Sequence, residues 1–234
     1  MIPPPDDCRL IIFDWDGTLM DSISTICGCL AHAFAYAGLV DRGEQQYQEI
    51  IGLGLEDALA ALAPDADKPT RERILEGYRE CFFSTPLREM PLFPGVENTV
   101  VQLADAGYEI AVATGKARRG LDRVLGEHPR LAACISASRC ADESRSKPDP
   151  LMLHELLQHY DLPPAAAIMV GDTVHDMEMA VAAGVLPLGV LCGVHSAERL
   201  DASGAAACFT DPTALPGWLI RTRTGDKYPS RNSG

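Results

Sequence analysis

Apolar and polar positions follow two different rhythms along this chain, and these rhythms predict where strands and helices lie. Every residue from Leu10 to Phe13 is apolar, which is typical of a strand buried on both faces, so we expect a strand at 9–14. From Asp21 to about Met90 the apolar residues instead recur at the three- and four-residue spacing of amphipathic helices. The expected helices in this segment are 24–39, 55–64 and 70–83.

Helical and strand-like patterns alternate after residue 91. The expected helices are 95–106, 117–126, 149–159 and 175–183, and the expected strands are 108–113, 133–137, 166–171 and 187–192. Alternating elements of this length predict a parallel sheet with helices on both faces. We therefore expect an α/β fold with a Rossmann-like core of three layers.

The order of these patterns predicts a chain in two parts. The strand at 9–14 belongs to the same sheet as the later strands, so the helical stretch between them reads as an insertion. We expect 1–20 and 91–220 to form the sheet-containing core and 21–90 to form a helical insert. The polar segment 221–234 has no periodicity and is predicted to be a loose tail.

The chain is long and apolar enough for a sizeable core, and its charge narrows the range of partners. It has 234 residues, of which 47% are apolar, and a formal net charge of −13. An acidic protein repels polyanions, so this charge argues against nucleic acid as a general partner. A few local cations can still bind a small phosphate, because they act at much shorter range.

The spacing of the cysteines and the length of the apolar runs indicate in which cellular compartment the protein is expected. The cysteines are Cys8, Cys27, Cys29, Cys81, Cys134, Cys140, Cys192 and Cys208. They form no CxxC pair, which favours reduced thiols in a cytosolic protein over a disulfide framework. We see no signal-peptide pattern and no apolar run of the ~18 residues that a membrane span needs. We therefore expect a cytoplasmic protein with no membrane partner.

Polar residues gather where the predicted strands end. Ligands bind at the carboxyl ends of the strands in an open parallel sheet, so the residues at these positions are candidate site residues. They are Asp14, Asp16 and Gly17 after the first strand, Thr114 and Gly115 after 108–113, Lys147 in a later loop, and Asp172 and Asp176 after 166–171. Four separate segments thus bring acids, a hydroxyl and a lysine toward one point.

Clustered carboxylates repel one another unless a cation lies between them, and Mg²⁺ prefers oxygen ligands of this kind. Thr114, Lys147 and the backbone N–H groups after the first strand can then bind phosphate oxygens. Asp14 can attack phosphorus in line to give an aspartyl-phosphate. Asp16 can protonate the leaving oxygen and later deprotonate the attacking water. The residues therefore predict phosphoryl transfer assisted by Mg²⁺.

Four short motifs in this chain resemble those of the haloacid dehalogenase-like hydrolase superfamily. "DWDGTL" at 14–19 resembles motif I, Thr114 resembles motif II, Lys147 with Pro148 resembles motif III, and "GDTVHD" at 171–176 resembles motif IV. The motifs occur in the order of the family. The helical insert resembles the small cap of the phosphoglycolate phosphatase-like subgroup. In that subgroup the cap closes over the site and contacts the leaving group of the substrate.

The resemblance implies a role for each acid. Asp14 is similar to the family's nucleophile and binds Mg²⁺ through its other oxygen. Asp16 resembles the general acid and base, and its backbone carbonyl also meets the metal. Asp172 resembles the metal-binding acid of motif IV, and Asp176 resembles its partner, on the metal or next to its ligands.

The resemblance also implies which residues bind the phosphate. Thr114 and Lys147 look like the residues that stabilise the phosphate and the intermediate, with Gly115 beside them. Gly17 permits the tight turn after the first strand and is a further candidate for binding substrate.

One stretch of the helical insert, 52–59, lacks the basic residue that would bind a second anionic group of the substrate. "GLGLEDAL" at 52–59 resembles the substrate-facing loop of the subgroup, yet it contains no lysine or arginine. A second anionic group on the substrate would then need an arginine from elsewhere in the insert. The candidates are Arg42, Arg71, Arg79 and Arg88.

Taken together, the residues and the resemblance predict a Mg²⁺-dependent phosphatase. Its substrate would be a small phosphorylated metabolite, namely a phosphoglycolate-like ester, a sugar phosphate or a nucleotide. A phosphoryl transferase of the β-phosphoglucomutase type shares every motif and stays open as an alternative. A binding protein without catalysis is a further alternative, and the sequence leaves open whether the protein is a monomer or a homodimer.

Overall fold

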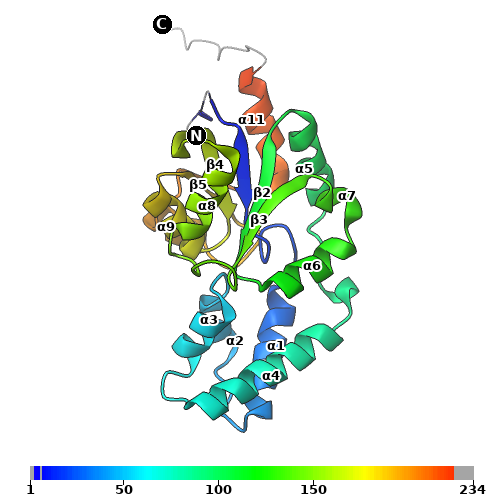
Figure 1. The fold of residues 1–234 in the computed structure, drawn as a ribbon, viewed down its shortest axis with the longest axis vertical. Helices are drawn as coiled ribbons and strands as arrows, with labels where there is room; N and C mark the ends of the chain where they lie inside the picture. The colour runs from blue at the N-terminus through cyan, green and yellow to red at the C-terminus, as the bar shows by residue number, and fades with distance from the viewer. Residues whose placement is uncertain (1–2, 6, 224–234) are drawn as a thin grey trace, which may run out of the picture.

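The centre of the molecule is a parallel sheet in the computed structural model, which describes residues 3–5 and 7–223. Its strands are β1 (Leu10–Phe13), β2 (Glu109–Thr114), β3 (Ile135–Cys140), β4 (Ala167–Gly171), β5 (Leu186–Val190) and β6 (Ala207–Phe209). They lie in the order β3-β2-β1-β4-β5-β6, and each neighbouring pair is parallel (Figure 1). This sheet confirms the predicted α/β fold with a Rossmann-like core.

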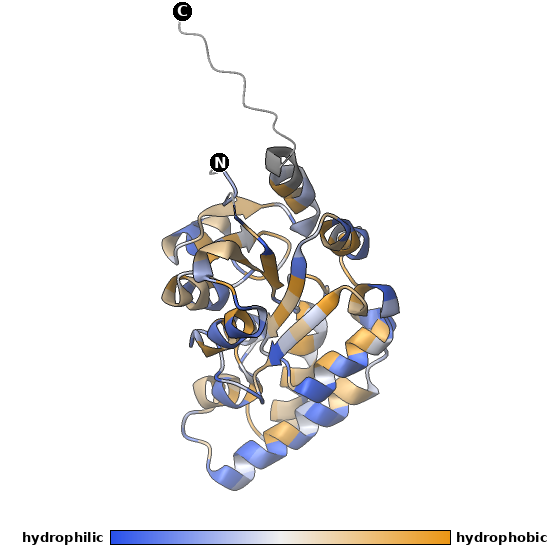
Figure 2. Cartoon of the chain, turned by 45° about the horizontal axis from the view of Figure 1, so that its top comes forward, coloured by the Kyte–Doolittle hydropathy of each residue, from blue (hydrophilic) through white to orange (hydrophobic). Residues whose placement is uncertain are grey.

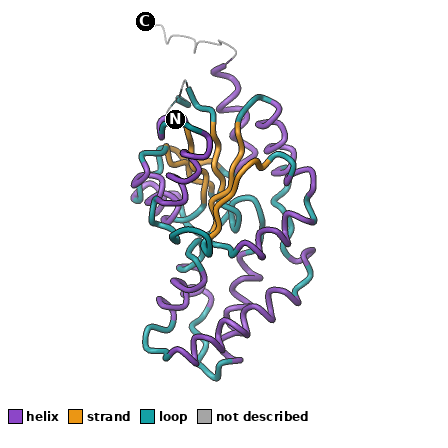
Figure 3. Tube along the Cα trace, viewed as in Figure 1, coloured by secondary structure: helices purple, strands orange, loops and turns teal. Residues whose placement is uncertain are grey.

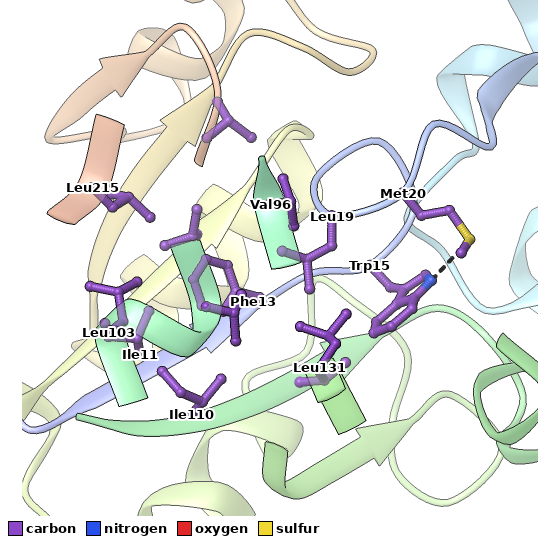
Figure 4. Packing of buried hydrophobic residues seen from close by; sticks show 14 of the residues in the cluster. Ile11, Phe13, Trp15, Leu19, Met20, Val96, Leu103, Ile110, Leu131 and Leu215 are labelled. Atoms are coloured by element: carbon purple, nitrogen blue, oxygen red, sulfur yellow. Dashed lines mark hydrogen bonds between the residues drawn. The ribbon is translucent and has the colours of Figure 1, made fainter. Parts of the chain in front are cut away.

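Helices cover both faces of the sheet. The side chains of β1 point alternately to either side, and since all of them are apolar, both faces must be covered. Ile11 and Phe13 pack with α5 (Val96–Asp105), α6 (Arg118–Gly126), α7 (Pro129–Ala132) and α11 (Leu215–Arg223), as Figure 4 shows in part. Leu10 and Ile12 pack against α8 (Leu151–Tyr160) and α9 (Val174–Ala183). Figure 2 shows hydrophobic residues on the central strands, as these two buried layers require.

Most predicted elements of the core lie within a few residues of the observed ones, and the differences occur at its margins. The edge strand β3 was expected at 133–137 but runs over Ile135–Cys140. The short elements α10 (Ala197–Ala202) and β6 were not predicted. The single-turn helices are Leu87–Glu89, Pro164–Ala166 and Pro212–Ala214. The segment 221–234 that was expected as a loose tail begins inside α11, which continues to Arg223, and 224–234 lie outside the described residues.

The helical insert contains only helices and loops, and it lies at one end of the sheet (Figures 1 and 3). Its helices are α1 (Ile23–Tyr36), α2 (Glu44–Glu49), α3 (Leu55–Leu62) and α4 (Lys68–Ser84). They share a buried apolar cluster of their own, which includes Ile26, Phe34, Leu59 and Ile74. The short helix α2 was not predicted, since only Tyr47 of its residues is buried.

The two segments that join the insert to the sheet lie side by side. The N–H of Asp21 donates to the carbonyl of Pro91 at 2.8 Å, and the N–H of Phe93 donates to the carbonyl of Leu19 at 3.0 Å. The chain therefore leaves the core and returns to it at one place. Trp15, next to this place, is fully buried and donates its indole N–H to Met20 Sδ at 3.2 Å (Figure 4).

The expectation that all cysteines are reduced thiols is wrong for one pair. Cys29 on α1 and Cys81 on α4 form a disulfide, with their Cα atoms 5.4 Å apart. Helical neighbours far apart in sequence bring the two together, which residue spacing alone does not reveal. None of the other six cysteines is in a disulfide. No helix among the described residues is long and apolar enough to cross a bilayer.

Candidate active site

Four of the predicted site residues, Asp14, Lys147, Asp172 and Asp176, meet at the carboxyl ends of β1 and β4. The order of the strands reverses between these two neighbours, since the chain proceeds from β1 toward β2 and β3 and later from β4 toward β5 and β6. Such a reversal creates a crevice in an open parallel sheet. Phe13 is in register with Val170, so Asp14 and Asp172, which follow shortly after, lie across this crevice from one another.

Lys147 joins two of the acids. Its Nζ lies 2.6 Å from Asp14 Oδ1 and 2.7 Å from Asp176 Oδ1, and all three side chains are buried. Burial alone would lower the pKa of Lys147, but the two carboxylates outweigh it and raise that pKa above the usual value. Lys147 is therefore a fixed cation, although it supplies only one positive charge to three buried acids.

Only one carboxylate oxygen of Asp14 faces Lys147. Its Oδ2 is buried and has no hydrogen-bond partner among the described residues. Burial raises the pKa of Asp14 well above its usual value, Lys147 opposes this rise, and Asp176 and Asp172 add to it. A carboxylate oxygen that is buried without a partner is costly unless a ligand meets it.

Asp172 is held on every side. Its Oδ1 accepts from the Thr18 hydroxyl at 2.8 Å, and its Oδ2 accepts from the Val194 N–H at 2.9 Å. Gly17 and Gly193 allow this fit, because a Cβ would lie 2.3 Å or 2.0 Å from Asp172 Oδ2, respectively. Gly17 also has a φ of +77°, which favours glycine. Burial and then Asp176 raise the pKa of Asp172 to about 7.

Asp176 contributes to the site and to a helix start at the same time. Its Oδ2 accepts from the N–H of Thr173 at 3.1 Å and from the Thr173 hydroxyl at 2.7 Å, in a capping box at the start of α9. Its Oδ1 faces Lys147. The helix cap thus fixes the carboxylate toward the other acids.

These acids form a group that fits a divalent cation. Asp14, Asp172 and Asp176 each offer a carboxylate oxygen, and these atoms lie within 4.8 Å of one another. Burial raises the pKa of both Asp14 and Asp172, and within the described residues Lys147 is the cation that pairs with this group. Oxygen ligands and excess negative charge suit Mg²⁺.

Asp16 lies outside this group and has partners that sequence reasoning missed. Its Oδ1 accepts from the Ser22 hydroxyl and lies 2.8 Å from Lys116 Nζ. Lys116 Nζ also lies 4.8 Å from the ring centroid of Phe82 on α4. The position of Lys116, two residues after Thr114, could have marked it as a site residue, whereas the role of Ser22 depends on a turn that no pattern predicts.

Thr114 is the last residue of β2, and Gly115 after it lies close to the insert. Thr114 is fully buried, and its hydroxyl accepts the N–H of Lys116 at 3.2 Å. It caps no helix, since α6 begins at Arg118 with Ala117 at the N-cap position. A Cβ on Gly115 would lie 2.4 Å from the carbonyl oxygen of Leu53, so the insert approaches the core closely here.

A cavity of about 950 Å³ lies between the sheet and the helical insert, with Asp14 and Asp16 among its lining residues. The insert contributes the loop 52–54, and the core holds this loop through the Gly54 N–H, which donates to Ser146 Oγ at 2.7 Å. Arg79 and Phe82 of α4 and Lys116 and Arg119 of the core also line the cavity.

The structure distinguishes among the candidate arginines of the insert. Arg79 lines the cavity and has no ion-pair partner among the described residues. Arg42 and Arg71 donate to the backbone carbonyls of Leu62 and Pro64 and so stabilise the insert itself. Arg88 is not among the cavity-lining residues.

His195 is a further residue that the sequence left without a role. It is 3% exposed, and its Nδ1 accepts the N–H of Val174 at 2.9 Å. Burial lowers the pKa of His195 to about 4, with Arg199 adding to the effect and Glu49 opposing it, so the ring is neutral near pH 7.

Comparisons with known proteins agree with this geometry. The family model described as haloacid dehalogenase-like hydrolase matches residues 11–190. Phosphoglycolate phosphatase of Rhodospirillum rubrum is 32% identical over 220 residues, covering 90% of each chain. Phosphoglycolate phosphatase of Vibrio vulnificus is 26% identical over 204 residues, covering 84% of this chain and 90% of that protein.

A solved haloacid dehalogenase-like hydrolase from Bacteroides fragilis has the same fold, with a TM-score of 0.82 and 23% identity. It covers 89% of this chain, and the match includes 99% of that structure. Because the family model covers most of the chain and the relatives match nearly from end to end, this protein belongs to the haloacid dehalogenase-like hydrolases and is a phosphatase of the phosphoglycolate phosphatase-like subgroup.

Proposed function

We propose that this phosphatase hydrolyses a small phosphomonoester with Mg²⁺ and that Asp14 is its nucleophile. The observation that carries the proposal concerns Asp14, which lines the cavity and whose buried Oδ2 has no hydrogen-bond partner among the described residues. Lys147 holds the other oxygen, so the free oxygen has a fixed direction. A fixed nucleophile beside a cavity is the arrangement that in-line attack requires.

The reaction proceeds in two displacements at phosphorus. Asp14 Oδ2 attacks, the bond from phosphorus to the ester oxygen breaks, and Asp16 gives its proton to the departing oxygen. Asp16 then takes a proton from water, whose oxygen attacks the phosphorus of the aspartyl-phosphate. Inorganic phosphate leaves and Asp14 is restored. Ser22 and Lys116 hold Asp16 in place during both steps.

Four residues would hold the cation. Asp172 and the Oδ1 of Asp14, the oxygen that does not attack, would supply carboxylate oxygens, Asp16 would supply its backbone carbonyl, and Asp176 would bind directly or through a ligand. When bound, Mg²⁺ neutralises the phosphate and the acids that face it. Thr18 and Val194 orient Asp172 for this task. Thr114, Gly115, Gly17 and Lys147 would face the phosphate oxygens.

The helical insert serves as a cap domain in this proposal, with 1–20 and 91–220 as the catalytic core. Its separate apolar cluster and the contact of the loop 52–54 with Gly115 and Ser146 support this division. A cap over the cavity excludes water that would compete with the leaving group.

We propose an anionic leaving group. Arg79 of the insert and Arg119 of the core both line the cavity, and neither has an ion-pair partner in the described part of the chain. Unpaired arginines are informative in a protein with a net charge of −13. A phosphorylated hydroxy acid, the substrate class named for the relatives, would satisfy both cations.

The proposal is tested by measuring phosphate release from a panel of small esters, with Mg²⁺ and with a chelator. The panel contains phosphoglycolate, sugar phosphates, nucleotides and a generic aryl phosphate. We expect metal-dependent release, which Asp14→Asn abolishes while the exposed control Asp122→Asn leaves it intact. Release by Asp14→Asn at the wild-type rate would refute the assignment of the nucleophile. Phosphorylated Asp14 without release would indicate the transferase.

A further inference from the structure

We infer that His195 is a positioning residue that connects the helical insert to the loop carrying Asp172 and Asp176. The inference rests on the proposed function, because it concerns the geometry of the proposed metal ligands. The side chain of His195 is fully buried between the loop that follows β4 and the end of α2. Each of its two ring nitrogens faces one of the two parts of the molecule.

The first nitrogen fixes the metal-binding loop. Nδ1 accepts the N–H of Val174, which lies between Asp172 and Asp176 in the chain. The backbone N–H of His195 donates to the carbonyl of Asp172 at 3.2 Å, and its neighbour Val194 donates to the carboxylate of the same residue. The segment 193–195 therefore wraps around Asp172.

The second nitrogen faces the insert. Because Nδ1 accepts a hydrogen bond, the single ring proton of the neutral imidazole is on Nε2. Nε2 is buried without a hydrogen-bond partner in the described part of the chain, and it lies 3.9 Å from Glu49 Oε2. Glu49 is the last residue of α2, three positions before the loop 52–54.

Other contacts hold Glu49 close to this nitrogen. Arg199 donates to both oxygens of Glu49, at 2.8 Å each, and the Nε2 of His175 lies 3.2 Å from the backbone carbonyl of Glu49. A hydrogen bond between nitrogen and oxygen needs about 2.9 Å, so a shift of roughly 1 Å would complete the bond from His195 to Glu49.

This geometry lets His195 connect Glu49 of the insert to Val174 of the metal-binding loop. The loop 52–54 already contacts Gly115 and Ser146, so a ligand in the cavity need shift only α2 by this distance for Glu49 to accept the buried N–H of His195. The imidazole then holds Val174 and Asp172 in the arrangement that binds metal. A bond that forms only after Glu49 has shifted couples the position of the insert to metal binding. Such coupling is reciprocal, so metal binding also favours the shifted position of the insert.

Two variants separate the two nitrogens. In His195→Asn the side-chain oxygen can replace Nδ1, but nothing replaces Nε2. In His195→Gln the amide reaches toward Glu49, but the acceptor for Val174 is lost. Glu49→Ala removes the partner from the insert. Glu155→Ala is the matched control, since it breaks a comparable pair with Arg139 (2.8 Å) away from the insert.

Two measurements that need no turnover test the inference, namely Mg²⁺ affinity by calorimetry and amide hydrogen exchange of 50–54 with and without inorganic phosphate. We expect His195→Gln to weaken Mg²⁺ binding about tenfold, as loss of an outer partner of a ligand does. We expect His195→Asn and Glu49→Ala to keep Mg²⁺ affinity near the wild type but to lose the protection of 50–54 that phosphate induces. The double variant that carries His195→Asn and Glu49→Ala should lose no more of this protection than either single variant.

Wild-type values for both histidine variants, or losses that simply add in the double variant, would overturn the inference and leave His195 as a packing residue. If the histidine variants do not fold, Glu49→Ala alone decides, because unchanged phosphate-induced protection refutes the link. Phosphate release by the wild type and by Asp14→Asn is measured in parallel. A failure of the proposed function is therefore seen there, independently of the outcome for His195.

Discussion

The Nζ of Lys147 lies 2.6 Å from Oδ1 of Asp14, and neither side chain is exposed to solvent. Lys147 is shared with Asp176, so one cation serves two carboxylates while Asp172 is buried beside them. The site is therefore short of positive charge until a second cation or a proton arrives.

We predict that Lys147→Met is destabilised most in the absence of Mg²⁺. Removal of one partner from a buried ion pair costs about 3–5 kcal/mol of unfolding free energy, because the remaining charges lose their compensation. We expect activity to fall at least about a hundredfold, since a fixed charge that faces the phosphate is lost. Urea unfolding at pH 7.5, with and without Mg²⁺, measures the first effect. Equal stability of wild type and variant without metal would contradict this reading.

The pKa of Asp172 predicts how stability depends on pH without metal. The folded protein raises this pKa from 3.8 to about 7, so between these values it keeps a proton that the unfolded chain has lost. Stability of the metal-free protein should then fall as pH rises from about 4 to 7, by up to about 1.4 kcal/mol per pH unit for each proton. Asp14 acts in the same direction.

Thermal unfolding across this range checks the prediction, because each kcal/mol corresponds to about 2–4 °C in Tm for a domain of this size. Mg²⁺ should restore stability at the upper end of the range, since it binds the ionised acids. Asp172→Asn should flatten the profile of the metal-free protein. A profile that is identical with and without Mg²⁺ would contradict a cation site at these acids.

Gly115→Ala tests the contact between core and insert. The added Cβ would lie 2.4 Å from the carbonyl oxygen of Leu53 and 2.7 Å from that of Gly52, so the loop 52–54 must move away. We expect kcat/KM to fall about tenfold to a hundredfold, because misplaced groups lose near-attack geometry. Gly126→Ala is the control, since a Cβ there meets nothing within 4 Å. Unchanged kcat/KM would mean that the loop does not need this position.

Reduction of the Cys29–Cys81 disulfide should lower the stability of the protein. The bond spans 52 positions, and in the chain-entropy model a loop of this size contributes up to about 4 kcal/mol. Cys81→Ser should show the same loss of Tm and should not respond to reductant, whereas Cys134→Ser should respond like the wild type. Peptide mapping without reductant identifies the pair. A wild-type Tm that reductant leaves unchanged would contradict a stabilising role.

The sequence predicted the sheet well because strands buried on both faces have continuous apolar runs, as in β1 and β4. The edge strand β3 has only one fully buried residue, Cys140, so its pattern is weak and its predicted start was too early. The helix α2 was missed for the same reason, since a single buried residue gives no period.

The same limit applies to the site. Asp14 and Asp172 could be found because strand ends converge in any parallel sheet, so position in the chain implies position in space. The partners of these acids cannot be found in this way. Ser22 reaches Asp16 through a turn, and Glu49 approaches His195 from 146 positions away, so both contacts depend on how separate elements pack.

The hydrogen bonds from Asp21 to Pro91 and from Phe93 to Leu19 bring both ends of the insert to one point of the sheet. A stretch whose ends meet can grow, shrink or be exchanged during evolution while the rest of the chain spans the same distances. Changes within this one continuous piece of the gene can therefore alter Arg79 and the loop 52–54 without altering the residues proposed to act on phosphorus.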